Sequence, residues 1–232
     1  MKTIGLLGGM SWQSTAHYYR IINEEVARRL GGLHSAQIVM SSLDFDVMEK
    51  LQQTGRWQEA GEWLAEEAVR LGRAGADFVL ICANTMHKVA DQVQQTSGIP
   101  VLHIADAVAE VIKKQGIGRV GLLGTRYTME EDFYRARLVD MHGLEVIIPG
   151  DEDREMINRV IYEELCRGIV RNESRGDYLD TMRKLEKAGA GGIILGCTEI
   201  EIIVSPADFH LPMFPTTFIH SVAAVDKALS EV

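Results

Sequence analysis

The 232-residue sequence is poor in features that mark several large classes of protein. It has three cysteines, Cys82, Cys166 and Cys197, with no CxxC pair and no His-rich spacing, so we expect neither a disulfide framework nor a bound metal. No apolar run approaches the roughly 20 residues of a bilayer span, and the N-terminal segment lacks signal-peptide architecture. We therefore expect a protein of the reducing cytoplasm.

Positive charge is also scarce. Lys and Arg number 24 against 33 Asp and Glu, which gives a net charge of -9 and a pI near 5.3. No basic stripe is available to neutralise phosphates, which argues against a nucleic-acid partner and against binding to an anionic membrane. The hydrophobic content of 46% can bury a sizeable core, and the length suits one large domain or two small lobes.

Short apolar runs that end in glycine or small polar residues predict buried strands, and longer segments of helical periodicity lie between them. The expected strands are residues 3–7, 36–42, 77–82, 119–123, 144–148 and 192–195. The expected helices are residues 12–30, 57–73, 105–114, 154–167 and 178–188, one that continues through Val93, and one that opens near Pro215. No helix or strand is predicted for the polar stretch after the second strand, through Gln52 and Gln53.

An internal repeat decides the architecture. The run beginning at Ile4 recurs at Val120, an offset of 116, and the strand end at Ala83 matches the strand end at Cys197, an offset of 114. Two such similar offsets imply two copies of one α/β lobe. We predict two pseudo-symmetric lobes, each a parallel sheet flanked by helices, with the active site in the cleft between them. The first lobe would comprise residues 1–100 plus a C-terminal helix at about 216–232, and the second residues 101–215.

The strand that ends in Gly196-Cys197-Thr198-Glu199 is the strongest candidate for chemistry. A free cysteine is often only a small core hydrophobe. Here, however, Gly196 lets a ligand approach the backbone, and Thr198 and Glu199 add a hydroxyl and a carboxylate that an apolar core would not use. The sequence therefore favours Cys197 as a reactive thiol at the edge of a parallel sheet.

Glycines and capping residues follow the other strands. Met10 and Ser11 end a glycine turn that lacks both the GxGxxG spacing and a Walker lysine, so the helix start favours a carboxylate over a nucleotide. Asn84 and Thr85 follow another strand, where helix capping is their alternative role.

Four segments together closely resemble the aspartate/glutamate racemase family, the cofactor-independent enzymes grouped with hydantoin racemase, over essentially the whole chain. They are Gly8-Gly9-Met10-Ser11-Trp12, Asn84-Thr85-Met86-His87, Gly124-Thr125-Arg126 and Gly196-Cys197-Thr198-Glu199. The resemblance implies an isomerase that needs no pyridoxal phosphate or other cofactor, acts on a small amino acid and is usually a homodimer. In that family, two cysteines face the α-carbon from opposite sides.

This sequence departs from the family at one of those cysteines, because Ala83 stands at its position and has no proton to give. Cys82 is one residue earlier, and since strand side chains alternate, it should point into the packed interior. Three outcomes are open: Cys197 racemises slowly or one-sidedly with water or Thr85 as its partner, it catalyses a single-cysteine reaction such as decarboxylation, or the protein binds an amino acid without turning it over. The racemase is our expectation, and an interaction module without a ligand site is the contrasting class.

The resemblance also assigns the remaining site residues. Met10, Ser11 and Gln52 would line the substrate pocket, while Asn84, Thr85 and Thr198 would hold the α-carboxylate. Arg126 could pair with a second carboxylate or be a surface cation, and Glu199 could tune the thiol or cap its helix. His87 and His220 are expected to be hydrogen-bonded framework residues, and Cys166 receives no chemistry. Pro215 is a second departure, since the family often has Asp there.

Overall fold

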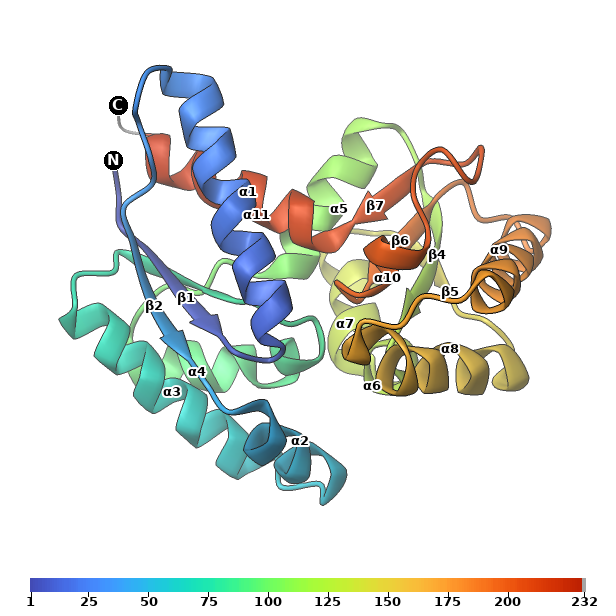
Figure 1. The fold of residues 1–232 in the computed structure, drawn as a ribbon, viewed down its shortest axis with the longest axis horizontal. Coiled ribbons are helices and arrows are strands. Elements are labelled where there is room, and N and C mark those ends of the chain that lie inside the picture. Colours follow the sequence, from blue (N-terminus) through green and yellow to red (C-terminus); the bar gives the residue numbers. More distant parts are fainter. Residues whose placement is uncertain (231–232) are drawn as a thin grey trace. The chain divides into compact units, whose positions relative to one another are not determined.

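The computed structural model describes residues 1–230, which form an α/β chain that divides into two compact units (Figure 1). Unit 1 comprises Met1–Ile104 with Thr217–Val232, and unit 2 comprises Ala105–Thr216. The last two residues of the C-terminal helix expected at 216–232 lie outside the described residues. Each unit is built on its own parallel sheet flanked by helices, which confirms the predicted fold class.

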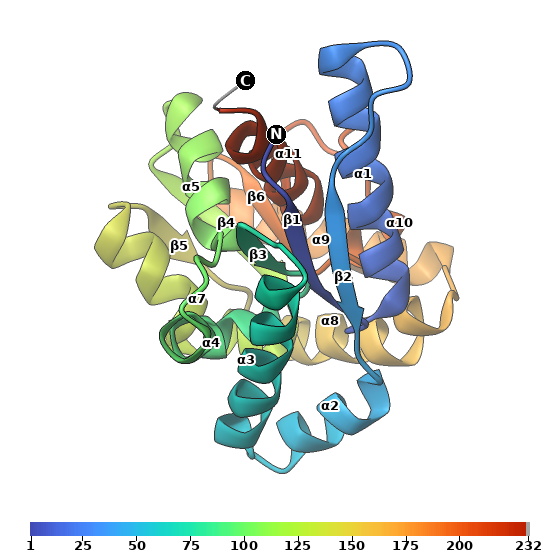
Figure 2. The same ribbon diagram turned by 90° about the vertical axis from the view of Figure 1, so that its left-hand side faces the viewer.

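Unit 1 is built on a three-stranded parallel sheet in the order β2-β1-β3, whose strands lie side by side in Figure 2. The strands are β1 (Ile4–Gly8), β2 (Ile38–Ser42) and β3 (Phe78–Ile81). The helices are α1 (Trp12–Leu30), α2 (Phe45–Gln53), α3 (Trp57–Arg73), the 3-10 helix η1 (Thr85–Val89), α4 (Ala90–Ser97) and α11 (Thr216–Leu229).

The two faces of this sheet pack against different helices because successive strand side chains point to opposite sides. Leu7 and Ile81 belong to the cluster that includes the buried face of α3. Leu6 and Cys82 belong to the cluster that includes α1 and α11, where Cys82 is fully buried. Ala83, the next residue, is partly buried against the α3 cluster. The prediction that Cys82 points into the packed interior is therefore confirmed.

Unit 2 is built on a four-stranded parallel sheet in the order β5-β4-β6-β7. The strands are β4 (Arg119–Gly124), β5 (Glu145–Ile147), β6 (Ile193–Gly196) and β7 (Met213–Pro215). The helices are α5 (Ile104–Lys114), α6 (Arg126–Glu130), α7 (Asp132–Ala136), the π-helix η2 (Arg137–Met141), α8 (Asp151–Glu163), the 3-10 helix η3 (Leu165–Arg167), α9 (Asn172–Lys187) and α10 (Ile200–Ile203). Ile193 and Leu195 of β6 pack with α8 and α9 in a cluster that continues to Cys197.

The predicted repeat is confirmed in the topology, since β1 lies between β2 and β3 as β4 lies between β5 and β6. The glycine that ends each central strand is needed for close packing. A Cβ on Gly8 would lie 2.3 Å from the Thr15 side chain, and one on Gly124 would lie 3.1 Å from that of Thr128. Both glycines thus let the following helix approach its strand.

Several boundaries differ from those expected. Helix α2 is not expected from the sequence because its nine residues fall short of the roughly 11 to 18 over which helical periodicity is recognised, although Phe45, Met48 and Leu51 recur at helical spacing and the Asp44 carboxylate caps it. Helix α8 begins at Asp151 and ends at Glu163, so Cys166 lies in the separate turn η3. Helix α9 begins at Asn172, six residues before the expected start, because its first turns are polar.

Candidate active site

Cys197 is held at the carboxyl end of β6, where the strand turns into α10. Its side chain belongs to the core of unit 2, and the residue is only 9% exposed. The thiol donates a hydrogen bond to Oε2 of Glu199 over 2.9 Å, and the Thr198 hydroxyl donates to the same oxygen over 2.6 Å. Three consecutive residues therefore form one small polar cluster inside an apolar surrounding.

Burial is the largest cause that raises the pKa of the Cys197 thiol well above its ordinary value. The Glu199 carboxylate adds to this, since its negative charge disfavours a neighbouring thiolate. A free thiol titrates near pH 8.5, so the resting Cys197 keeps its proton at neutral pH. The site therefore holds a protonated thiol in hydrogen-bond contact with the Glu199 carboxylate.

Cys166, to which the sequence assigned no chemistry, also influences this thiol. It is partly buried against the same core cluster as Cys197, and its charge would further raise the Cys197 pKa. Its position in η3, which packs near α10, could not be read from the sequence because thirty residues separate the two thiols.

The edge of the unit 2 sheet brings the predicted Gly124-Thr125-Arg126 segment beside Cys197. Gly124 and Gly196 are register partners on adjacent strands. A Cβ on Gly196 would lie 2.7 Å from the Leu123 carbonyl oxygen, so only glycine fits there. The hydroxyl of Thr125 accepts a hydrogen bond from the Thr128 backbone N–H and caps α6.

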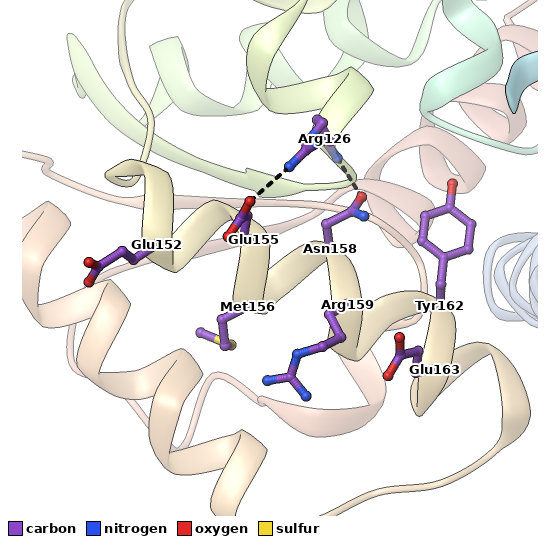
Figure 3. Close-up of a pocket in the computed structure, with 8 residues that line it drawn as sticks. All are labelled: Arg126, Glu152, Glu155, Met156, Asn158, Arg159, Tyr162 and Glu163. Carbon is purple, nitrogen blue, oxygen red and sulfur yellow. Dashed lines mark hydrogen bonds and ion pairs between the residues drawn. The ribbon is translucent and has the colours of Figure 1, made fainter.

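Arg126 lies at this edge, and its side chain is directed at carboxylates of its own unit. The guanidinium is 3.6 Å from Glu130. Figure 3 shows its contact with Glu155, also at 3.6 Å, and the hydrogen bond of 2.8 Å that the Arg126 backbone N–H donates to Asn158 Oδ1. Arg126, Glu155 and Asn158 border an open pocket of about 550 Å³ along α8. Binding of a substrate carboxylate by Arg126 stays a prediction, and it would have to compete with two glutamates.

In unit 1, the predicted Ala83-Asn84-Thr85 segment follows β3 directly and begins η1. Asn84 and Thr85 are buried, while Ala83 is partly exposed. The Asn84 carbonyl accepts a hydrogen bond from the backbone N–H of His87, which closes the first turn.

The remaining predicted residues of unit 1 gather near this segment. Met10 belongs to the core cluster against which Ala83 packs, and the Ser11 hydroxyl caps α1 by accepting from the Ser14 backbone N–H. Gln52 lies in the last turn of α2 and is 4% exposed, so its side chain is buried rather than solvated. Its amide donates to Met86 Sδ over 3.0 Å, a contact that sequence reasoning missed.

The predicted residues thus fall in two groups, one in each unit. Cys197, Thr198 and Glu199 belong to unit 2 with Arg126 at the start of α6, and unit 1 holds Met10, Ser11, Gln52, Ala83, Asn84 and Thr85. Among residues 1–230, no cluster of three or more His, Cys, Asp or Glu side chains is suited to hold a metal. Within the same described range, no helix combines the length and apolar character needed to cross a membrane.

Known proteins resemble this chain in both sequence and structure. A profile described as Asp/Glu/Hydantoin racemase matches residues 7–228. A candidate Asp/Glu racemase from Yersinia pestis, solved as a crystal structure, is 55% identical, with a TM-score of 0.94 and coverage of 99% of this chain and 100% of that one. An aspartate racemase homologue from Pyrococcus horikoshii OT3 is 36% identical, with a TM-score of 0.84 and coverage of 98% and 99%.

A curated relative is more distant. The broad specificity amino-acid racemase RacX of Bacillus subtilis (strain 168) is 30% identical over 158 residues, and this match spans 66% of this chain and 66% of the relative, just under two thirds of its length. Together, the profile and the two solved structures confirm the resemblance seen in the sequence: the chain belongs to the Asp/Glu/hydantoin racemase family.

Proposed function

We propose that this protein is an amino-acid racemase that exchanges the α-proton of its substrate through Cys197 without a cofactor. The observation that carries the proposal is the hydrogen bond from the Cys197 thiol to the Glu199 carboxylate in a member of a racemase family. The names of the Pyrococcus horikoshii and Bacillus subtilis relatives support an amino acid as the substrate.

The reaction begins with the proton of Cys197. Transfer of the thiol proton to Glu199 leaves a thiolate, which then removes the α-proton of the bound amino acid. The electron pair of the broken C–H bond moves onto the α-carbon and the adjacent carboxylate, where hydrogen-bond donors stabilise the developing charge. By the family resemblance, Asn84, Thr85 and Thr198 supply those donors. The 9% exposure of Cys197 keeps most water away from the thiolate, which strengthens it as a base.

The second half of the reaction depends on Ala83. If Cys197 returns a proton after its thiol has traded hydrogen with solvent, the amino acid keeps its configuration and only its α-hydrogen is exchanged. Inversion requires a proton from the other face of the α-carbon, and Ala83 offers none. We expect water or the Thr85 hydroxyl to deliver it, so inversion should be slower than exchange.

The test measures exchange and inversion separately. The protein is incubated in D2O with a panel of L- and D-amino acids, and α-proton loss and chirality are followed together, beside a Cys197→Ser variant. Exchange that exceeds inversion and disappears in the variant supports the proposal. An absence of exchange across the panel would refute it and favour a decarboxylase or a binding role for the same site.

A further inference from the structure

Unit 1 contains three buried histidines that the reaction above does not use: His87 in η1, His103 before α5 and His220 in α11. The His87 ring lies 4.5 Å from the His103 ring and 5.7 Å from the His220 ring, measured between centroids. Buried imidazoles packed this closely are expected to be neutral, because adjacent positive charges in an apolar core would repel each other.

The hydrogen bonds fix which nitrogen of His87 carries the proton. The backbone N–H of Ile104 donates to Nε2 over 3.2 Å, so Nε2 must present a lone pair. Nδ1 therefore carries the hydrogen and donates to the carbonyl oxygen of Ala83 over 2.9 Å. His87 is thus a neutral imidazole with one donor and one acceptor, both of them engaged.

His220 is also held by two hydrogen bonds, but both go to residues outside the Ala83 segment. Its Nε2 donates to the Leu102 carbonyl over 2.8 Å, which leaves Nδ1 to accept from the Tyr18 hydroxyl over 2.9 Å. The expectation that both His87 and His220 are hydrogen-bonded residues is confirmed. His87 bonds directly to the Ala83 carbonyl at the end of β3, whereas the two bonds of His220 go to Leu102 and Tyr18.

His87 holds that segment at two points. Its ring donates to the Ala83 carbonyl, and its backbone N–H donates to the Asn84 carbonyl over 3.0 Å. With two consecutive carbonyls fixed, the peptide planes on either side of Asn84 cannot rotate freely, and the directions of the Asn84 and Thr85 side chains follow from those planes.

We propose that His87 is a positioning residue that sets the orientation of Asn84 and Thr85 for binding the α-carboxylate of the substrate. This inference rests on the proposed function for the role of the segment, whereas the tautomer and the two anchoring bonds stand on geometry alone. A hydrogen-bond donor at the Nδ1 position is the property of His87 that matters.

Two amide substitutions separate the two ring nitrogens. In His87→Asn, the side-chain NH2 occupies roughly the place of Nδ1 and can still donate to the Ala83 carbonyl. In His87→Gln, the amide reaches the place of Nε2 and leaves that carbonyl without its donor. His220→Gln is the matched control, because it disturbs the same buried cluster away from Ala83.

The measurements are KM and kcat for α-deuterium exchange, the melting temperature, and amide hydrogen exchange of the peptide covering residues 82–89. We expect His87→Gln to raise KM about tenfold with a smaller change in kcat, equivalent to about 1.4 kcal/mol of binding free energy. It should also speed amide exchange in the peptide. His87→Asn should restore both readouts to near the wild-type values, and His220→Gln should lower the melting temperature while leaving KM nearly unchanged.

The outcomes distinguish this inference from the proposed function. If wild-type protein exchanges α-protons but His87→Asn and His87→Gln behave alike, or His220→Gln raises KM as much, the positioning role is wrong. If the wild-type protein exchanges no α-proton, the proposed function fails, and amide exchange then decides the inference. A difference between the Asn and Gln variants in the 82–89 peptide upholds the anchoring role, and its absence overturns it.

Discussion

Glu199 has two roles at Cys197 that predict opposite effects of a Glu199→Gln substitution. Its charge raises the Cys197 pKa, and we propose that it also accepts the thiol proton. The amide oxygen of Gln can still accept from the Cys197 thiol and from Thr198, which now meet on one carboxylate oxygen at 2.9 and 2.6 Å. The local geometry is therefore retained, but the side chain can no longer take a proton.

The substitution has two effects on the rate of α-proton exchange, and they are opposite in sign. Glu199 is among the causes that raise the Cys197 pKa, so removing its charge lowers that pKa, and each unit of decrease gives about tenfold more thiolate at neutral pH. Loss of a positioned proton acceptor costs about 10² to 10⁴ in rate. If Glu199 receives the thiol proton, as we propose, exchange should fall by at least about tenfold even after the gain in thiolate.

The assay follows α-deuterium incorporation by NMR from about pH 6 to about pH 9, the range that brackets an ordinary thiol. Amino-acid affinity is measured in parallel by calorimetry. Thr198→Val is measured beside it, because it removes one hydrogen bond to Glu199 and the hydroxyl proposed to hold the α-carboxylate, so it should weaken amino-acid affinity while the Glu199 carboxylate stays in place. A Glu199→Gln protein that exchanges as fast as or faster than the wild type at neutral pH would refute the role of proton acceptor.

Four further substitutions test other features. Ala83→Cys adds a single sulfur atom to a partly exposed side chain and should speed inversion by about 10²-fold or more; chiral analysis that shows no gain would exclude this position from the reaction. Burial raises the pKa of the Cys82 thiol, so the folded protein keeps a proton that the unfolded chain loses above about pH 8.5. The free energy of unfolding should therefore be constant with respect to this group below that pH. Above it, the free energy of unfolding should fall by up to about 1.4 kcal/mol per pH unit. Urea unfolding at rising pH should show a shallower loss in Cys82→Ala. Gly9→Ala should lower the free energy of unfolding by about 3 kcal/mol or more, since φ is +89° and a Cβ would lie 2.2 Å from a facing backbone oxygen. Gly32→Ala, at φ +58° in open space, should lower it by only about 1 kcal/mol in the same denaturation measurement.

Much of the fold could be predicted because its signals are local. The apolar runs that end at Gly8 and Gly124 are complete within a few residues, and their repetition alone predicts two similar sheets. The opposite orientations of Cys82 and Ala83 follow from strand alternation. In contrast, α2 spans only nine residues, too short a run for its helical spacing to stand out from the polar sequence around it.

In the candidate site too, the contacts that could be predicted are those between residues close together in the sequence. The contact between Cys197 and Glu199 joins residues two apart, and a tuning role for Glu199 was among the expectations. The contact from Gln52 to Met86 joins residues 34 apart, and the engagement of Arg126 by Glu155 depends on how α8 packs. Such contacts are set by tertiary structure, which the spacing of residues along one sequence does not encode.

Unit 1 draws on both ends of the sequence, and this has a consequence for biosynthesis. Ala224, Val225 and Ala228 of α11 complete the core on one face of the β1-β3 sheet, whereas unit 2 is one uninterrupted segment. We expect unit 2 to be able to fold on the ribosome as soon as it emerges, while the sheet of unit 1 waits with one apolar face incompletely covered until α11 has been translated. Nascent chains arrested before α11 should therefore be the ones that chaperones retain.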